Sequence, residues 1–434
     1  MISKIFGFFL SILIAFTSLS NTVPQVKPMD IEPDSSFVPV LRFVATSDTH
    51  VKEFGDLGCQ RIMKMIETGY AAADADSNYK KLDAAVLVGD MTDYGWPWRF
   101  GYIKMCTDSV LRDGTDLLCV AAKNHDGYIG RICRAWASGV SGDDADFHKV
   151  INGYHFIGLS ASRTLLKHYT NKQIKWLDKE LAKAVAEDPS KPVFVFQHEH
   201  IEGTVYGGYT SDGWGVDFLT DVLNKYPQVI DISGHSHYPA NDPRAIYQDT
   251  FTAINDGGMA YYEFTVDGQT SYHPESSDNM AHMLLVEVDA QNRVRVRVCD
   301  LNEEAVMAEY MIDNVASAHK TKYNQAVRRS NATAPVINEK PVVSVDGNKA
   351  NITVKPAQPG KDDVVFIYRL QILNSAGETV ASQKRLGDYY KHIEPQNLSF
   401  TFSDLAAGEY TLKLVAEGAW EYVSEPVYVN FTVK

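Results

Sequence analysis

Cysteine is scarce in this sequence. The 434 residues contain five cysteines: Cys59, Cys106, Cys119, Cys133 and Cys299. Five are too few for the disulfide framework that stabilises small secreted domains, and the odd number leaves at least one unpaired. We expect Cys119 and Cys299, which lie in apolar strand-like runs, to be small buried hydrophobic residues. With 45% apolar and 22% charged residues, the chain has the ordinary composition of a protein with a hydrophobic core.

Basic residues are also in the minority. The chain has 41 lysines and arginines against 55 aspartates and glutamates, which gives a net charge of -14. Nonspecific binding to nucleic acid requires clustered lysine and arginine that displace counterions, and we do not expect it here. A small anionic substrate is still compatible with this charge, because bound metal ions dominate the local field of a site.

Long apolar runs are missing after the N-terminus. Residues 1–20 are predicted to be a signal peptide, with Lys4 as the positive charge, an apolar run from Ile5 to Phe16, and small residues at Ser18 and Ser20. The run is shorter than the roughly 20 residues of a membrane-spanning helix, so we expect cleavage and secretion rather than a retained anchor. No cysteine follows it for lipid attachment, and no later segment predicts a transmembrane helix.

The length of the chain predicts two or three domains. After an extended lead-in at residues 21–37, residues 38–316 alternate strand-like apolar runs with helical stretches, which predicts a layered α/β domain. The expected strands are 40–45, 84–88, 117–121, 193–196 and 229–232. Helices are expected at 62–73 and 173–186, and the second of these has Ile174, Leu177, Leu181 and Val185 on one face.

The last quarter of the chain has a different pattern. Residues 317–336 are polar and basic, as in a linker, and residues 337–434 contain about seven short strands separated by turns. That spacing predicts a separate β-sandwich. Four N-x-S/T glycosylation sequons lie in this quarter, at Asn331, Asn351, Asn397 and Asn430; their use would require a eukaryotic secretory pathway.

Five short polar segments each follow an apolar strand-like run. They are Ser47-Asp48-Thr49-His50, Gly89-Asp90-Met91-Thr92-Asp93, Asn124-His125-Asp126, Gln197-His198-Glu199-His200 and Gly234-His235-Ser236-His237. In α/β folds, side chains from distant parts of the chain converge at the carboxyl ends of the strands. Aspartate, asparagine and histidine are ligands for borderline transition metals. One such pair would be a weak signal, but five in order predict two adjacent metal sites, which suit in-line phosphoryl displacement.

These segments resemble the calcineurin-like metallophosphoesterase family, whose pattern is D-x-H, GD-x-x-D, GNH-D/E, a lone His and GH-x-H. The resemblance covers about residues 38–310 and implies an α/β/β/α layered sandwich. It implies that one metal is held by Asp48, His50 and His237, and the other by Asn124, His198 and His235, with Asp90 bridging the two. It also implies that His125 protonates the leaving-group oxygen and that Asp126 orients His125. The pair of ions, divalent or of mixed valence, is left open among Fe, Mn, Zn and Co.

The sequence departs from the family pattern at two positions. Lys123 stands where the family usually has glycine, which leaves three alternatives: a tolerated substitution, a strained loop, or a lysine that reaches the substrate phosphate. Purple acid phosphatases have a tyrosine ligand where this chain has Asp93, so an iron–tyrosinate centre is not expected. The segment GDMTDYG is more similar to the cyclic-nucleotide phosphodiesterase and acid sphingomyelinase branches.

Other residues near these motifs have two interpretations each. Seven aromatic residues either line the mouth of the site or pack loops onto the core: Trp96, Trp98, Tyr128, Tyr206, Tyr209, Trp214 and Tyr238. His200 is either a substrate contact or structural, and His155 is expected to pack within a strand. Residues 338–434 resemble a fibronectin type III domain through the segment Leu405 to Tyr410, although the usual second-strand tryptophan is absent. Its role is left open between a spacer and a module that docks a protein or a surface glycan.

The function expected from this resemblance is that of a secreted phosphoesterase acting on phosphate mono- or diesters. A hydroxide bridging the two metals would attack phosphorus in line, and His125 would act as general acid. The alternative is a binding or adhesion protein that retains the fold with a weakened site. The complete ligand set favours the hydrolase, because function is inferred from the site rather than from the fold.

Overall fold

A computed structural model describes residues 23–434 except residue 33 and the segments 128–130 and 162–167. The predicted signal peptide therefore lies outside the described residues. The chain divides into two compact units: an N-terminal unit, residues 1–241 with 245–324, and a C-terminal unit, residues 242–244 with 325–434. This division lies inside the stretch predicted as a linker. Residues 317–324 of the predicted linker belong to the N-terminal unit, where the side chains of Lys320 and Tyr323 are buried.

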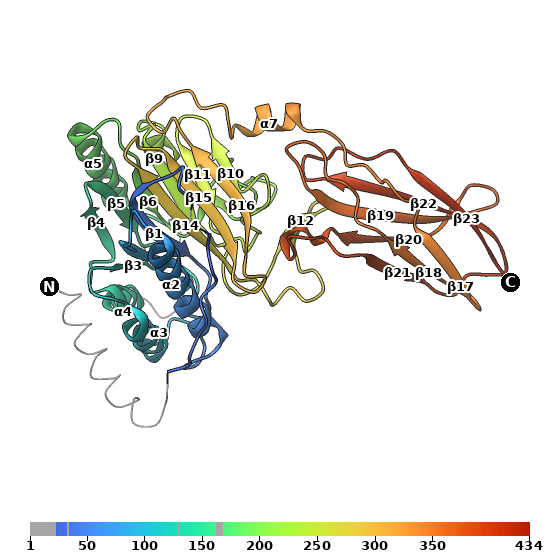
Figure 1. Cartoon of the computed structure of the whole chain (residues 1–434), viewed down its shortest axis with the longest axis horizontal. Coiled ribbons are helices and arrows are strands. Elements are labelled where there is room, and N and C mark those ends of the chain that lie inside the picture. Colours follow the sequence, from blue (N-terminus) through green and yellow to red (C-terminus); the bar gives the residue numbers. More distant parts are fainter. Residues whose placement is uncertain (1–22, 33, 128–130, 162–167) are drawn as a thin grey trace. The chain divides into compact units, whose positions relative to one another are not determined.

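The N-terminal unit contains two six-stranded sheets (Figure 1). In spatial order, the first sheet consists of β16 (Ala305–Ile312), β15 (Val294–Asp300), β14 (His282–Asp289), β1 (Pro39–Thr46), β2 (Ala84–Val88) and β3 (Asp116–Val120). The second consists of β10 (Ile246–Gln248), β11 (Thr252–Asn255), β9 (Val229–Ser233), β6 (Val193–Phe196), β5 (Tyr154–Leu159) and β4 (Asp146–Ile151). Strands β1, β2 and β3 run parallel to one another, as do β5, β6, β9 and β11. Each parallel set therefore has all its carboxyl ends at one edge.

Three hydrophobic clusters show how the layers are stacked. The first packs one face of the first sheet against α2 (Leu57–Ala75), α3 (Pro97–Val110) and α4 (Arg131–Ser141). The second fills the space between the two sheets and includes Phe43 from one and Phe196 from the other. The third packs the second sheet against α5 (Asn171–Glu187) and α6 (Thr220–Leu223). The order is thus helices, sheet, sheet, helices, which confirms the predicted α/β/β/α class.

The helices begin where the sequence supplies capping groups. The carboxylate of Asp56 accepts a hydrogen bond from the backbone nitrogen of Cys59 and caps α2. A capping box starts α5, because Thr170 and Gln173 each bind the backbone nitrogen of the other. The side chains of Leu177 and Leu181 are buried in the third cluster, which confirms the predicted apolar face of this helix.

The C-terminal unit is a β-sandwich of the seven predicted strands. One sheet has β17 (Val342–Asp346), β18 (Lys349–Val354) and β21 (Leu398–Phe402), and the other has β20 (Thr379–Leu386), β19 (Val365–Asn374), β22 (Gly408–Gly418) and β23 (Val427–Val433). The hydroxyl of Tyr410 donates to the carbonyl oxygen of Ala406 at 2.9 Å, the contact of a tyrosine corner. The sandwich is confirmed, while its fibronectin type III resemblance, its docking role and the use of its sequons stay predictions.

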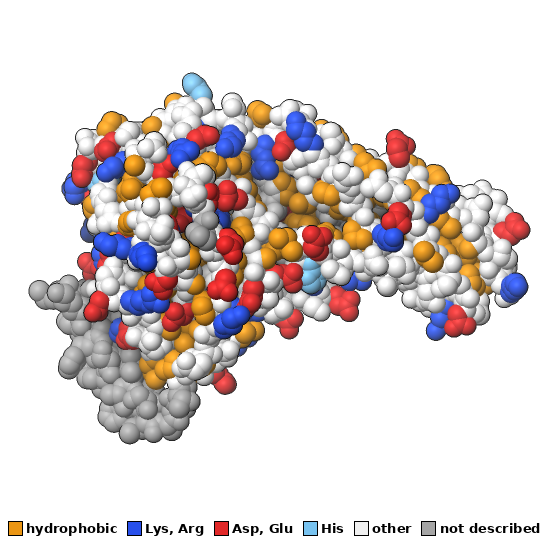
Figure 2. All heavy atoms as spheres, in the orientation of Figure 1, with side chains coloured by type: hydrophobic (Ala, Val, Ile, Leu, Met, Phe, Trp, Pro, Cys, Tyr) orange, Lys and Arg blue, Asp and Glu red, His pale blue; other side chains and the backbone are white. Residues whose placement is uncertain are grey.

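Shorter elements connect these layers: β7 (His200–Ile201), β8 (Gly215–Val216), β12 (Phe264–Val266), β13 (Gln269–Tyr272), α7 (Gln325–Asn331) and a 3-10 turn at Asp388–Tyr390. Within the described part of the chain, no helix has the length and apolarity that a membrane span requires. Acidic and basic side chains are intermixed over the face shown in Figure 2. The four cysteines whose side chains are described, Cys59, Cys106, Cys119 and Cys299, are buried and free.

Candidate metal centre

All five predicted segments lie at carboxyl ends of parallel strands. Asp48 follows β1, Asp90 follows β2, Asn124 follows β3, His198 follows β6 and His235 follows β9. Because the two sheets face each other across the second cluster, the ends of β1 and β2 meet the ends of β6 and β9. The backbone nitrogen of His235 accordingly donates to Asp48 Oδ2 at 2.9 Å, although the two residues are 187 positions apart.

The backbone at this edge is held in an uncommon conformation. Asp48, His50, Asp90, His235 and His237 have φ angles of 51°, 44°, 45°, 72° and 56°. Such left-handed conformations cost about 1–3 kcal/mol each in residues other than glycine and persist only where the surroundings enforce them. Here hydrogen bonds between neighbouring segments do so, including Asp48 N to Gly89 O at 3.0 Å and His50 N to Asp90 O at 3.1 Å. The concentration of strain marks a functional site.

The first ligand group consists of Asp48, His50 and His237, which lie close enough to share one ion. The Nε2 atoms of His50 and His237 are 3.3 Å apart, and His237 Nε2 is 3.3 Å from Asp48 Oδ1. Two imidazole nitrogens about 2.0–2.1 Å from one tetrahedral ion lie about 3.3–3.4 Å apart. Burial lowers the pKa of His237 to about 3, which keeps its ring neutral, the form that binds metals.

The second ligand group consists of Asp90, His198 and His235. His198 Nδ1 donates to the carbonyl oxygen of Val88 at 2.8 Å, which leaves Nε2 as the ligand atom, 3.2 Å from Asp90 Oδ2. Burial lowers the pKa of His235 as well. The amide oxygen of Asn124 is buried without a partner on the loop after β3. Asp90 also lies within ligand distance of His50, so its position between the groups fits the predicted bridging role.

Several buried polar atoms of the predicted ligand residues lack a hydrogen-bond partner. Buried polar atoms normally form hydrogen bonds, and an unpaired one calls for an explanation. Among the described residues, six unpaired buried atoms belong to predicted ligands: Asp48 Oδ1, Asp90 Oδ1, Asn124 Oδ1, His198 Nε2, His235 Nδ1 and His237 Nδ1. Carboxylate, amide and imidazole donors in two overlapping groups are the set that a pair of transition-metal ions requires. The residues present therefore fit a dinuclear centre.

His125 is positioned by a contact that differs from the expected one. Its Nδ1 donates to the carbonyl oxygen of Asp93 at 2.7 Å, which leaves Nε2 unengaged. The Asp126 carboxylate instead accepts from the backbone nitrogens of Met91, Thr92 and Ala122 at 3.0–3.2 Å. Asp126 thus braces the loop that carries His125 rather than orienting the ring directly. Burial and the charge of Asp90 raise the pKa of Asp126 to about 6.

His125 also lies within ligand distance of His50 and Asp90, and its ring centroid is 4.5 Å from that of His50. It is therefore either a proton donor or an additional ligand. Its neighbour Lys123 is half-buried and is not among the described residues with a left-handed backbone. The loop does not require glycine at this position, which removes the strained alternative for Lys123.

A layer of contacts around the ligands was not predicted. Ser47 Oγ lies between the carboxyl groups of Asp48 and Asp256, 2.6 Å from Asp256 Oδ1. Burial raises the pKa of Asp256 well above its usual range, and the charge of Asp48 adds to this. The Ser47 hydroxyl thus links the predicted ligand Asp48 to a second buried carboxyl group. A signal was present in the sequence, because the segment from Asn255 to Gly258 also follows a parallel strand, β11.

The aromatic residues and the remaining histidines divide between the two interpretations. The ring of Trp214 stands edge-on to His235 at 5.2 Å, whereas Tyr206 and Tyr238 are buried, with their tilted rings in contact at 4.4 Å. Trp96 and Trp98 form an exposed stacked pair, and Tyr128 lies outside the described residues.

Both ring nitrogens of His200 face serine hydroxyls, Ser233 at 2.9 Å and Ser236 at 2.8 Å, which makes His200 structural. His155 is buried in β5, as expected, and its Nδ1 is 2.8 Å from His148 Nε2.

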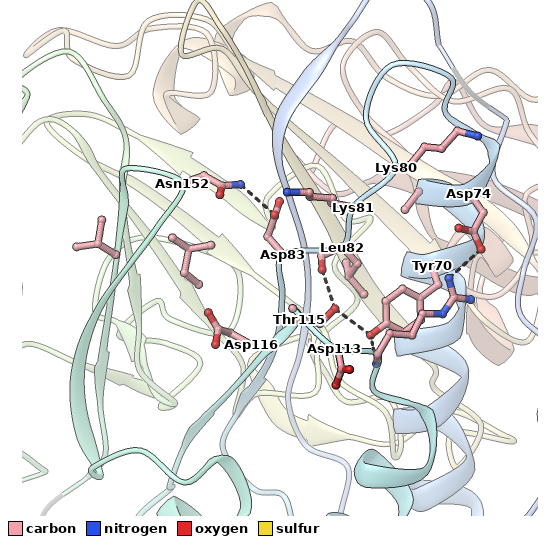
Figure 3. A pocket seen from close by; sticks show the side chains of 15 residues that line it. Tyr70, Asp74, Lys80, Lys81, Leu82, Asp83, Asp113, Thr115, Asp116 and Asn152 are labelled. Carbon is pink, nitrogen blue, oxygen red and sulfur yellow. Dashed lines mark hydrogen bonds and ion pairs between the residues drawn. The ribbon is translucent and has the colours of Figure 1, made fainter.

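A separate cavity of about 540 Å³ lies at the opposite edge of the sheets (Figure 3). It is lined by residues that precede β2 and β3 and by the end of β4. Its buried polar groups already bind one another: Tyr70 donates to Thr115, Thr115 donates to the carbonyl oxygen of Leu82, and Asn152 donates to Asp83. It lacks the unpaired ligand atoms that distinguish the metal centre.

Comparisons with known proteins point to phosphoesterases. No family model matches the chain. A probable cyclic nucleotide phosphodiesterase from Rhodococcus erythropolis is 26% identical over 206 residues, which make up 45% of this chain and 64% of that protein. The chain thus matches less than two thirds of this curated relative's length. The similarity confirms the predicted resemblance to metallophosphoesterases.

Solved structures show more distant likenesses. A purple acid phosphatase from yellow lupin (Lupinus luteus) seeds aligns with a TM-score of 0.44 and 13% identity, over 64% of this chain and 55% of that one. GAP50, the anchor in the inner membrane complex of Plasmodium, aligns with a TM-score of 0.41 and 14% identity, over 66% and 91% of the two chains. TM-scores this low do not by themselves establish a common fold.

Proposed function

We propose that the chain is a metal-dependent phosphoric ester hydrolase that acts on phosphate mono- or diesters. One observation carries the proposal: the predicted ligand residues converge at the strand ends, and six of their buried polar atoms have no hydrogen-bond partner. A binding protein with a weakened site would not need to maintain five strained ligand residues, since strain persists where a function requires it. The similarity to a phosphodiesterase supports the same conclusion.

The residues would divide the work as follows. Asp48, His50 and His237 would hold one ion, and Asn124, His198 and His235 the other, with Asp90 contacting both. Two such ions neutralise phosphoryl charge and activate water for in-line attack. His125 would move the proton: with Nδ1 bound to Asp93 O, only Nε2 is available to protonate the leaving-group oxygen.

Secretion belongs to the same proposal. It rests on the apolar run from Ile5 to Phe16 and the small residues that follow it. N-terminal sequencing of the mature protein tests it, and a mature chain that still begins at Met1 would contradict cleavage.

The function is tested with a panel of phosphate mono- and diesters, including p-nitrophenyl and bis-p-nitrophenyl phosphate. We expect turnover that a chelator abolishes and that added Mn, Zn, Fe or Co restores, with close to two ions bound per chain by elemental analysis. Protein that binds no metal after reconstitution, or binds two ions and hydrolyses nothing on the panel, would contradict the proposal.

A further inference from the structure

One aromatic residue without an assigned role lies against the first ligand group. The ring of Tyr261 stacks on the ring of His237, with centroids 3.8 Å apart and planes 11° apart. It is also 5.9 Å from the ring of His50. Tyr261, on the loop between β11 and β12, therefore lies against two residues of the first ligand group.

The loop holds Tyr261 in place from both sides. Before it, the backbone nitrogen of Met259 donates to Asp48 O at 3.4 Å, and after it, the backbone nitrogen of Glu263 donates to His237 O at 3.0 Å. Both acceptors, Asp48 and His237, are predicted ligand residues. Tyr262 points the other way, since it is buried and its hydroxyl contacts Asp300 Oδ2 at 3.3 Å. The alternation leaves Tyr261 facing the metal centre.

The ring and the hydroxyl of Tyr261 have different surroundings. His237 Nδ1 is buried without a hydrogen-bond partner, and the Tyr261 ring stacks face to face on this imidazole. The Tyr261 hydroxyl has no hydrogen-bond partner among the described residues, and the side chain is only partly buried. A tyrosine hydroxyl is neutral at pH 7 and can donate one hydrogen bond.

We propose that the Tyr261 hydroxyl donates a hydrogen bond to a non-bridging oxygen of the substrate's phosphoryl group, which makes Tyr261 a catalytic residue. The inference rests on the proposed function, because it takes the phosphoryl group to be bound beside His50 and His237. This hydrogen bond does not depend on the protonation states of the ligands. The donor is neutral, so it stabilises phosphoryl charge without competing with the ions for the carboxylates.

The experiment compares Tyr261→Phe with the wild type and with two further variants. Tyr261→Phe removes only the hydroxyl and keeps the ring on His237. Tyr261→Ala removes the ring as well. Tyr226→Phe is the matched control, because it also deletes a bonded tyrosine hydroxyl, one that donates to Asp178 on α5, away from the metal centre. Three quantities are measured: bound metal per chain, kcat/KM for a phosphate ester, and the affinity for inorganic phosphate by calorimetry.

For Tyr261→Phe we expect two bound ions, and a loss of about 10- to 100-fold in both kcat/KM and phosphate affinity, the range for a hydrogen bond to a charged group. Tyr261→Ala should in addition lose metal, and Tyr226→Phe should match the wild type. A merely structural tyrosine would not lower phosphate affinity while metal content stays constant.

Two results would overturn the inference. In one, Tyr261→Phe equals the wild type in kcat/KM and phosphate affinity, which leaves the proposed function intact. In the other, Tyr261→Phe loses metal, which would make the hydroxyl part of the metal site instead. If the wild type hydrolyses no ester, the proposed function fails, and the phosphate affinities still decide whether Tyr261 binds a phosphoryl group.

Discussion

The two units of this chain differ in whether their buried polar groups all have hydrogen-bond partners. In the described residues of the C-terminal unit, no buried side-chain nitrogen or oxygen is without a hydrogen-bond partner, whereas the N-terminal unit has several such atoms, and six of them belong to predicted ligand residues. The backbone shows the same contrast. Left-handed residues other than glycine in the C-terminal unit, namely Asp362, Asp404 and Glu421, lie in turns, while five in the N-terminal unit are predicted ligands.

The contrast separates a unit built for stability from one built around a site. Unpaired buried groups and left-handed backbone both cost free energy, and a fold keeps them only where something is gained. The described part of the β-sandwich has no unpaired buried side-chain nitrogen or oxygen, and its left-handed residues lie in the connections between strands. In the α/β unit, the predicted ligands combine unpaired buried atoms with left-handed backbone, and all of them lie at one edge of the sheets.

The largest effect is expected from Asp90→Asn. The Asp90 carboxylate lies within ligand distance of both groups, and the amide that replaces it has one acceptor oxygen instead of two and no charge. We expect bound metal to fall from two ions per chain to at most one, and turnover to fall to background. Elemental analysis and ester hydrolysis measure this.

Asp231→Asn provides the comparison for that variant. Asp231 is equally buried, and burial raises its pKa to about 7, but it lies within β9 rather than at its end. It should keep both ions. If Asp90→Asn retained two ions as well, the unpaired Asp90 atom would not be a metal ligand. Metal binding would then not explain the difference in unpaired atoms between the two units.

A smaller loss is expected from His125→Ala. Loss of a general acid costs about 10²–10⁴-fold, and the cost should appear with poor leaving groups, whose oxygen needs the proton. Esters of p-nitrophenol should be affected less, because p-nitrophenolate leaves without one. Both ions should remain bound.

Rates for the two kinds of ester, measured together with metal content, separate the roles that the structure leaves to His125. A loss of metal would make it a ligand, in line with its distance from His50 and Asp90. Equal slowing of good and poor leaving groups with both ions in place would make it a phosphate-positioning residue.

The sequence predicted the parts of the site that depend on strand ends. Apolar runs such as 84–88 and 193–196 coincide with β2 and β6, and the ligand types follow directly after them, so convergence at one edge could be inferred from parallel pairing. The seven strands of the sandwich were predictable for a similar reason, since alternating side chains mark half-buried strands.

Contacts across the fold could not be predicted in the same way. Tyr261 reaches His237, and Asp93 O reaches His125 Nδ1, through loops whose paths depend on tertiary packing rather than on local pattern. The role expected for Asp126 differed because its carboxylate accepts hydrogen bonds from backbone nitrogens of its own loop and of the loop after β2. Sequence spacing does not indicate which donors a buried carboxylate will meet.

In the C-terminal unit, Tyr410→Phe should have only a small effect. The variant removes the hydrogen bond to Ala406 O but keeps the ring stacked on Phe431, 5.6 Å away. We expect the free energy of unfolding of the sandwich to fall by about 0.5–1.5 kcal/mol, and ester hydrolysis to be unchanged. Hydrogen exchange of the β22 amides measures the first quantity. A fall in kcat/KM would show that the sandwich contributes to the site.

Only a small effect on activity is expected as well when the C-terminal unit is removed after Asn324. The N-terminal unit ends there and keeps Lys320, whose Nζ donates to the carbonyl oxygens of Pro227, Thr250 and Ser317 at 2.5–2.8 Å. We expect kcat/KM for small esters within about twofold of the full chain, because no predicted ligand is lost. A chain that ends after Ala316 is the informative partner. It lacks Lys320 and leaves the carbonyl oxygens of Pro227 and Thr250 without this donor, and an unpaired buried group costs about 1–3 kcal/mol. Thermal unfolding should therefore show the shorter chain to be less stable than the one that ends after Asn324. Equal stability would place the boundary of the catalytic unit at residue 316, as the sequence pattern predicts, and insolubility of both chains would mean that the α/β unit does not fold without the sandwich.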